Sequence, residues 1–144
     1  MFSFDLDDFE LVSTAPGRRV NFPLSSATGT ASTAAVLFEL DPGCELPLHR
    51  DSAEELLVVV QGTGEARIGD EVARLETHHV ALVPPLALHG VRNVGDDVLR
   101  ILGTFSSSTV VSTFEQPFEP GGPRLFVIGA PVRVAVPLAE PALA

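Results

Sequence analysis

The feature that most limits how this chain can fold is a succession of short strand-like runs separated by glycine- and proline-containing turns. Apolar and β-branched residues cluster in segments such as 34–40, 79–83 and 98–105, and such residues fit a half-buried pleated surface. No segment keeps an apolar period of 3.6 residues over about 11 residues, which an amphipathic helix would show. About ten short strands at regular spacing therefore predict an all-β sandwich or barrel.

Local turn chemistry predicts how some of these strands pair. Residues 65–68 and 71–75 are expected to form a hairpin across Gly69–Asp70, with glycine at the first central position of the turn. Pro23 cannot donate a hydrogen bond to a neighbouring strand, so the run 18–24 is expected at a sheet edge.

The two ends of the chain and one internal segment have looser patterns. The acidic and phenylalanine-containing start, residues 1–14, predicts an edge strand or an arm that packs on a partner subunit. Residues 106–123 mix Ser, Pro, Gly and Phe, which suggests an extended excursion that serves as a lid or a dimer element. Two further strands are expected at 125–128 and 132–136, before a loosely held tail.

Length and charge narrow the class of protein. A chain of 144 residues is expected to be one domain, residues 1–144, with a core barrel at about 17–138. No apolar run approaches the ~18–20 residues that span a bilayer, and no signal-peptide pattern is present, which predicts a cytoplasmic protein without a membrane partner. The single cysteine excludes an internal disulfide. A net charge of −10 with no lysine repels phosphate backbones, so nucleic acid is not an expected partner.

One stretch, residues 43–62, places polar side chains where an apolar strand face is expected. His49, Asp51 and Glu55 are odd-numbered, so in one continuous strand they share a face, with Glu54 on the other. One imidazole and two carboxylates turned into an apolar sheet carry a large desolvation cost. A metal ion removes much of this cost because its ligands are not left as unpaired buried charges. The stretch therefore predicts a metal site inside the barrel.

The spacing of this region resembles that of the cupin superfamily, in particular a small single-domain bacterial cupin. The first cupin motif reads G-x5-H-x-H-x3,4-E-x6-G, and its positions are held here by Gly43, His49, Asp51, Glu55 and Gly62. The second motif reads G-x5-P-x-G-x2-H-x3-N, and its Pro, His and Asn are matched by Pro84, His89 and Asn93. The two motifs cover residues 43–93. The resemblance implies a double-stranded β-helix, a jelly-roll barrel with a metal site inside its mouth.

The resemblance also implies which residues bind the metal. His49, Glu55 and His89 form a set of two histidines and one carboxylate, which suits a non-haem Fe(II) ion with open coordination positions. Fe(II) is the expected ion, and Mn, Ni and Zn are alternatives. Asp51 stands where the family has a second histidine. Three roles stay open for it: a fourth ligand, an acceptor for an imidazole N–H, or a solvated residue at the rim.

The chain departs from the family pattern at both glycines of the second motif, which are His78 and Leu86 here. Leu86 changes a tight turn, so the approach of His89 to the site is an open question. His78 and His79 are adjacent, so on a strand they point to opposite faces. A surface or hydrogen-bonded histidine is the expectation, and a role for one of them at the pocket wall stays open. Phe105 and Phe114 could line a pocket or pack the core, and core packing is the expectation.

Three functions are compatible with these residues. The first is a mononuclear, dioxygenase-like metal-dependent oxygenase, or a related lyase or isomerase, acting on a small organic molecule. The second is a non-catalytic cupin that binds a small molecule in the barrel with a degenerate metal site. The third is a structural protein that has lost the site. The absence of lysine weighs against a phosphorylated sugar as ligand, and the resemblance implies a homodimer.

Overall fold

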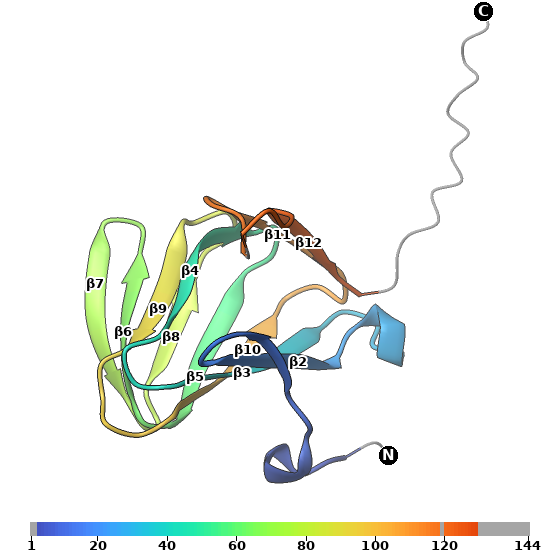
Figure 1. The fold of residues 1–144 in the computed structure, drawn as a ribbon. Helices are drawn as coiled ribbons and strands as arrows, with labels where there is room; N and C mark the ends of the chain where they lie inside the picture. The colour runs from blue at the N-terminus through green and yellow to red at the C-terminus, as the bar shows by residue number, and fades with distance from the viewer. Residues whose placement is uncertain (1–2, 119, 130–144) are drawn as a thin grey trace, which may run out of the picture.

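The computed structural model describes residues 3–118 and 120–129, and within them the chain forms twelve strands and two short 3₁₀ helices. The strands build two six-stranded sheets that face each other, and all of the strand pairs are antiparallel (Figure 1). This architecture confirms the all-β jelly-roll barrel predicted from the sequence.

The first sheet carries the N-terminal strands and one wall of the core. Its strands, in spatial order, are β1 (Val12–Ala15), β2 (Arg18–Leu24), β3 (Ala34–Leu40), β10 (Leu99–Phe105), β5 (Glu55–Gln61) and β8 (Val80–Val83). The helix η1 (Leu6–Asp8) precedes β1, and η2 (Ser26–Thr28) connects β2 to β3.

The second sheet carries the opposite wall of the core. Its strands, in spatial order, are β12 (Leu125–Ile128), β11 (Val110–Phe114), β4 (Glu45–Asp51), β9 (His89–Asn93), β6 (Thr63–Ile68) and β7 (Glu71–Glu76). The predicted hairpin is β6–β7, in which Ile68 pairs with Glu71. Gly69 has a φ of 61°, as a turn with glycine at its first central position requires.

The core lies between the two sheets and follows the alternation of each strand. In β10, Leu99, Ile101 and Phe105 are buried against residues of the second sheet, and Gly103 occupies the remaining inward position. Two polar residues are buried beside this apolar cluster on β9, His89 and Asn93. The amide of Asn93 donates to the carbonyl oxygens of Leu40 and Asp97, both at 2.8 Å, which ties β9 to the first sheet.

Three expectations about strand placement need correction or fall outside the described residues. β2 is an interior strand, paired with both β1 and β3, and a register shift between Asn21 and Leu24 accommodates Pro23 because a bulge removes the need for its missing N–H. The segment 106–123 contains a strand, β11, that joins β4 to β12. The strand expected at 132–136 lies outside the described residues.

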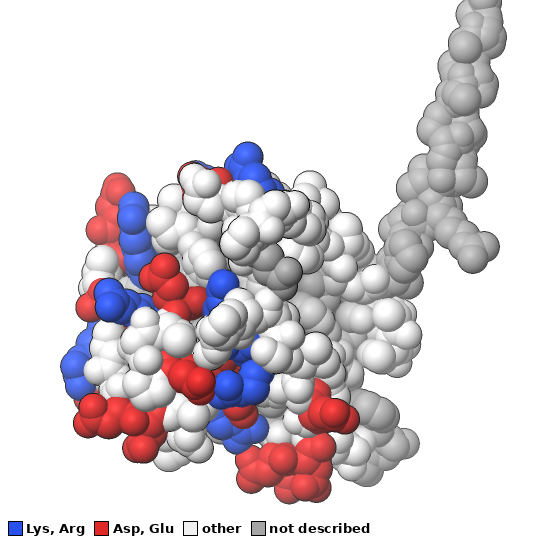
Figure 2. All heavy atoms as spheres, viewed as in Figure 1, with Lys and Arg blue, Asp and Glu red and all other residues white. Residues whose placement is uncertain are grey.

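Charged side chains are distributed unevenly over the surface. Figure 2 shows acidic groups gathered around η1, whereas acids and arginines are mixed on the β6–β7 hairpin. In the part of the chain that the structure describes, no helix is long and apolar enough to cross a membrane.

The turn before β9 keeps its shape although leucine replaces glycine in it. The amide of Ala87 donates to the carbonyl of Pro84 at 3.2 Å, and Leu86 has a φ of 65°, which is the pattern of a type II turn with proline at the second position. Leu86 donates its N–H to the Asp51 carbonyl and accepts from the Arg50 guanidinium, both at 2.8 Å. These two bonds hold the turn against the end of β4, so the approach of His89 to the site is preserved.

Replacing Leu86 with glycine is expected to stabilise the protein by about 0.5–1 kcal/mol, because leucine is strained in the left-handed region. The Leu86 side chain is 62% exposed, so its removal costs little packing free energy. Urea unfolding of the metal-free protein measures the change. Leu86→Ala is the matched control, because alanine keeps the Cβ atom that causes the strain. An equal gain from both substitutions would show that side-chain contacts, rather than the backbone, are responsible.

Candidate metal centre

The four predicted site residues come from three strands in two sheets. The stretch 43–62 is broken at residues 52–54, so His49 and Asp51 lie at the end of β4 in the second sheet, and Glu55 begins β5 in the first. The expectation of one continuous strand was therefore wrong. All three side chains nevertheless reach the core, because the chain crosses from one sheet to the other between them. His89 begins β9 and pairs directly with His49.

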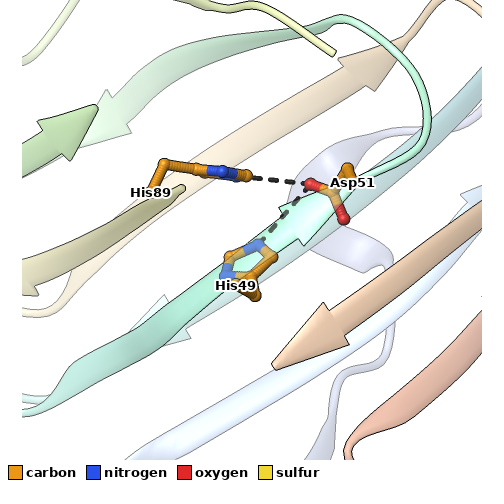
Figure 3. A group of neighbouring side chains, drawn as sticks. All are labelled: His49, Asp51 and His89. Carbon is orange, nitrogen blue, oxygen red and sulfur yellow. Dashed lines mark ion pairs between the residues drawn. The ribbon is translucent and has the colours of Figure 1, made fainter. Parts of the chain in front are cut away.

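Three of these side chains converge on one point. The Oδ2 atom of Asp51 lies 3.2 Å from Nε2 of His89 and 3.5 Å from Nε2 of His49, and Figure 3 shows both imidazoles directed at this carboxylate. The donor atoms of the three residues all lie within 4.8 Å of one another. All three are buried, with Asp51 only 2% exposed, which rules out the solvated rim position left open above. The cluster can therefore hold a metal ion.

Hydrogen bonds to the backbone fix the orientation of both rings. Nδ1 of His49 donates to the Pro47 carbonyl at 2.7 Å, and Nδ1 of His89 donates to the Ala87 carbonyl at 2.9 Å. A carbonyl oxygen can only accept, so the proton of each neutral imidazole is on Nδ1. The lone pairs of both Nε2 atoms then face Asp51. This arrangement, a ligand histidine held by a backbone carbonyl on its other nitrogen, is typical of metal sites.

The carboxylate of Asp51 has one oxygen satisfied and one free. Oδ1 accepts the hydroxyl hydrogen of Ser112 on β11, whereas Oδ2 is buried without a hydrogen-bond partner. Three unshared electron pairs, two from nitrogen and one from oxygen, thus surround a buried point. Such a point is unfavourable unless a proton or a cation is present. The donor set, two imidazoles and one carboxylate, fits a divalent ion.

Glu55 lies beside this cluster rather than at its centre. Its Oε2 atom is 3.3 Å from Nε2 of His89, and the side chain is 3% exposed. The other carboxylate oxygen packs against Gly103 of β10, where an added Cβ atom would meet Oε1 at 2.2 Å. The role of Glu55 as a metal ligand stays a prediction. His78 and His79, expected at the surface, are both exposed.

In the metal-free protein a proton occupies the place of a cation. Burial lowers the pKa of His89, but the carboxylates of Asp51 and Glu55 outweigh this effect and raise the pKa to about 10. Burial acts to raise the pKa of Asp51, yet the two histidines hold it well below its usual range. The pKa of Glu55 is raised, chiefly because burial disfavours its charged form. His89 therefore carries a proton between two carboxyl groups when no metal is bound.

The His89 proton makes the stability of the metal-free protein depend on pH. Because the folded-state pKa lies above the ordinary value of 6.5, protonation stabilises the fold fully below about pH 6.5, and this contribution is lost as the pH rises through about 10. Asp51 acts in the opposite sense. Its pKa is lowered, so its contribution is present above about pH 4 and is lost in acid.

Metal binding to this cluster is expected to tighten with rising pH, by about tenfold per unit between about pH 6 and 8, because the ion must displace the His89 proton. Titration with Co(II), followed by its visible absorption, measures the binding constant at each pH. His79→Ala is the control that removes an exposed histidine and should keep the same slope. A binding constant independent of pH over this range would contradict the displacement of a proton.

A cavity of about 260 Å³ opens from the cluster into the space between the sheets, and His49, Asp51 and Glu55 form part of its wall. Phe105 and Phe114 are buried in the core, as expected, and they also line this cavity. Sequence reasoning also missed Ser112, Phe118 and Phe126. The alternation of Val110, Ser112 and Phe114 in β11 was the available signal, and the Ser/Pro/Gly content around it obscured the strand.

Comparison with known protein families finds a match, and it covers the region that contains both motifs. A family model described as "Cupin domain" matches residues 36–105, which run from within β3 to the end of β10 and contain the candidate metal residues. No curated protein sequence matches the chain.

Solved structures share the fold at low sequence identity. The Cnp3 cupin domain of Schizosaccharomyces pombe is 19% identical over 73% of each chain, with a TM-score of 0.64. KdgF from Halomonas sp. is 22% identical over 74% of this chain and 94% of its own, with a TM-score of 0.62. Oxalate decarboxylase of Lactobacillus farciminis, in a formate complex, is 21% identical over 78% of this chain but 35% of its own, with a TM-score of 0.70. At these identities the comparison establishes the fold alone.

Proposed function

Because the chain belongs to the cupin superfamily, as the matched family model and the shared fold show, we propose that it is a metal-dependent enzyme acting on a small organic molecule. The proposed ion is Fe(II), and the proposed reaction class is that of a dioxygenase-like oxygenase or a related lyase or isomerase. The observation that carries this proposal is the convergence of the buried Oδ2 atom of Asp51 with the Nε2 atoms of His49 and His89.

The donor set supports the choice of ion. Two imidazoles and one carboxylate would supply three ligands to an ion and leave other positions open, which is the pattern of non-haem Fe(II) sites. When bound, such an ion acts as a Lewis acid toward substrate oxygen atoms and, if it is iron, can activate dioxygen. Ser112 orients Asp51, and the carbonyls of Pro47 and Ala87 orient the two histidines. Glu55 lines the cavity, where its carboxyl group can exchange a proton with a bound molecule.

A second function is favoured by a different observation. Nε2 of His89 lies 3.2 Å from Asp51 and 3.3 Å from Glu55, so a proton on His89 satisfies both carboxyl groups without a metal. In that case the protein is a cupin that binds a small molecule in the same cavity and has no catalytic ion. The two functions differ in whether the native protein contains metal.

Anaerobic loading with Fe(II), followed by addition of nitric oxide, separates the two functions. The proposed enzyme takes up close to one ion per chain, and nitric oxide then produces a half-integer-spin EPR signal because a coordination position is open. A zinc-loaded sample is the control and stays silent. Protein that takes up no ion is the metal-free binder, and protein that binds iron without responding to nitric oxide contradicts the oxygenase proposal.

A further inference from the structure

The cavity is small and mostly apolar, and His49, Asp51 and Glu55 contribute the charged or titratable groups next to its apolar lining. Its volume of about 260 Å³ exceeds the ~150 Å³ of an apolar cavity that binds benzene and falls below the ~300 Å³ at which sites for drug-sized ligands begin. There is room for one ring and a short head group. Six of the nine phenylalanines in the chain line it, so most of the aromatic content of the protein surrounds this one space.

Three of these rings form an aromatic wall that starts at a candidate ligand. The ring of His49 stacks on Phe114 with centroids 4.6 Å apart. Phe114 contacts Phe118 and Phe126 at 4.9 and 5.7 Å, and these two contact each other at 5.6 Å, all edge to face. Edge-to-face contacts are a preferred geometry for aromatic groups. The wall is therefore held in place by its own packing before any ligand binds.

Phe118 is held from its other side as well. The guanidinium of Arg18 lies 4.6 Å from the centre of the Phe118 ring, and its Nη2 atom donates to the Phe118 carbonyl at 3.4 Å. These contacts join β2 of the first sheet to the segment after β11. They hold the Phe118 ring, which lines the cavity.

Among the described residues that line the cavity, no cation is left without a carboxylate partner to pair with a second anionic group. Of the described lining residues, Arg19 is the only lysine or arginine. Its Nε atom is 3.0 Å from Glu39, and its Nη2 atom is 2.8 Å from Asp41. The guanidinium charge is thus already balanced by two carboxylates. A ligand with a second negative charge at its far end would lose hydration in this cavity without gaining an ion pair.

We propose that the cavity binds a single-headed aromatic ligand, with one oxygen-donor group at the metal cluster, one ring against the Phe114–Phe118–Phe126 wall, and no second charged group. This proposal rests on the proposed function, because the metal holds the head group. The aromatic wall sets the specificity for the rest of the molecule.

Two hydroxamates with the same head group and different bodies test this proposal. Benzohydroxamate and acetohydroxamate are titrated into the Co(II)-loaded protein, and the ratio of their binding constants isolates the contribution of the ring. We expect benzohydroxamate to bind about 30-fold more tightly, as burial of one ring predicts. A third probe, 4-carboxybenzohydroxamate, carries a second charge at the far end and should lose most of this gain. A ratio below about threefold, or equal binding of the charged probe, overturns the proposal.

Substitutions in the Phe114–Phe118–Phe126 wall test whether these rings cause the tighter binding of benzohydroxamate. Phe118→Ala should lower the ratio at least about threefold, and Phe4→Ala, which removes a ring that does not line the cavity, should leave it unchanged. Phe126→Arg introduces the missing cation and should tighten binding of 4-carboxybenzohydroxamate about tenfold. Two results together overturn the proposal: Phe118→Ala leaves the ratio of the benzohydroxamate and acetohydroxamate binding constants unchanged, and Phe126→Arg does not tighten binding of 4-carboxybenzohydroxamate. The ligand ring would then not lie against this wall.

Failure of the proposed function is distinguishable from failure of this inference. If the protein takes up no metal, the proposed function is wrong, and the wall is then tested in the metal-free protein with benzyl alcohol and 4-(hydroxymethyl)benzoate. Methyl NMR shifts at Val127 and Ile128 with the first probe alone support a single-headed aromatic site. Absence of these shifts, or equal shifts with both probes, overturns it.

Discussion

Replacement of Asp51 by asparagine is expected to weaken binding of a divalent metal at least about 100-fold, because it removes the one anionic donor, among the described residues, that faces both histidines. Asparagine has nearly the same shape and its carbonyl can still accept from Ser112, so the fold should be preserved. Competition with a chelator for Co(II), or isothermal titration, measures the affinity.

Matched variants make this prediction specific to the cluster. Ser112→Ala removes only the hydrogen bond that orients Asp51 and should cost about tenfold. Glu55→Gln tests the ligand set that the family resemblance implies. If Glu55→Gln abolishes binding while Asp51→Asn stays within about threefold of the parent protein, the carboxylate ligand is Glu55 rather than Asp51.

Replacement of Gly103 by alanine is expected to destabilise the metal-free protein by about 2–3 kcal/mol, at the upper end for overpacking of a closed core. Gly103 lies in the middle of β10, and its added Cβ atom would sit 2.2 Å from Oε1 of Glu55 and 2.9 Å from Val36. Glu55 is buried and bonded to His89, so it has little freedom to move. Urea unfolding measures the loss.

A second substitution identifies the cause of this loss. Glu55→Ala removes the atom that collides, so the double variant should be less destabilised than the sum of the two single variants. Gly95→Ala is the control, because its Cβ atom would be no closer than 3.4 Å to any neighbour. Additive effects of Gly103→Ala and Glu55→Ala would show that Gly103 does not make room for the Glu55 carboxyl group.

The strands were largely predictable because their signals are local. The runs that form β2, β3, β9 and β12 and the β6–β7 hairpin follow from residue alternation and from turns such as Gly69–Asp70. β11 was missed because its alternation is short and lies between Ser-rich and Pro-rich segments. The interior position of β2 was missed because a bulge, which sequence does not reveal, absorbs Pro23.

The site was predictable in its members but not in its arrangement. The motif spacing identified the four residues His49, Asp51, Glu55 and His89. The expectation that three of them share one strand face assumed a single strand, whereas the chain changes sheets at residues 52–54. The central place of Asp51 depends on the pairing of β4 with β9 and on a hydroxyl from β11. Those are contacts between distant parts of the chain, and no local pattern encodes them.

Leu86 shows the opposite case, in which a local rule fails. Glycine is the usual residue for a positive φ in a type II turn, yet leucine adopts that conformation here. The bonds from Leu86 to Asp51 and Arg50 connect the turn to the end of β4 and provide the tertiary support that offsets the strain. The loss of a motif glycine therefore does not displace His89.

Anomalous diffraction at the zinc edge, from crystals of the zinc-loaded protein, tests the central claim most directly. Zinc serves as a stable stand-in for the proposed ion, and the expected result is one peak at about 2.0–2.2 Å from Nε2 of His49, Nε2 of His89 and a carboxylate oxygen of Asp51. A peak held by Glu55 without Asp51, or the absence of any peak among these side chains, would contradict the claim that His49, Asp51 and His89 form the metal site.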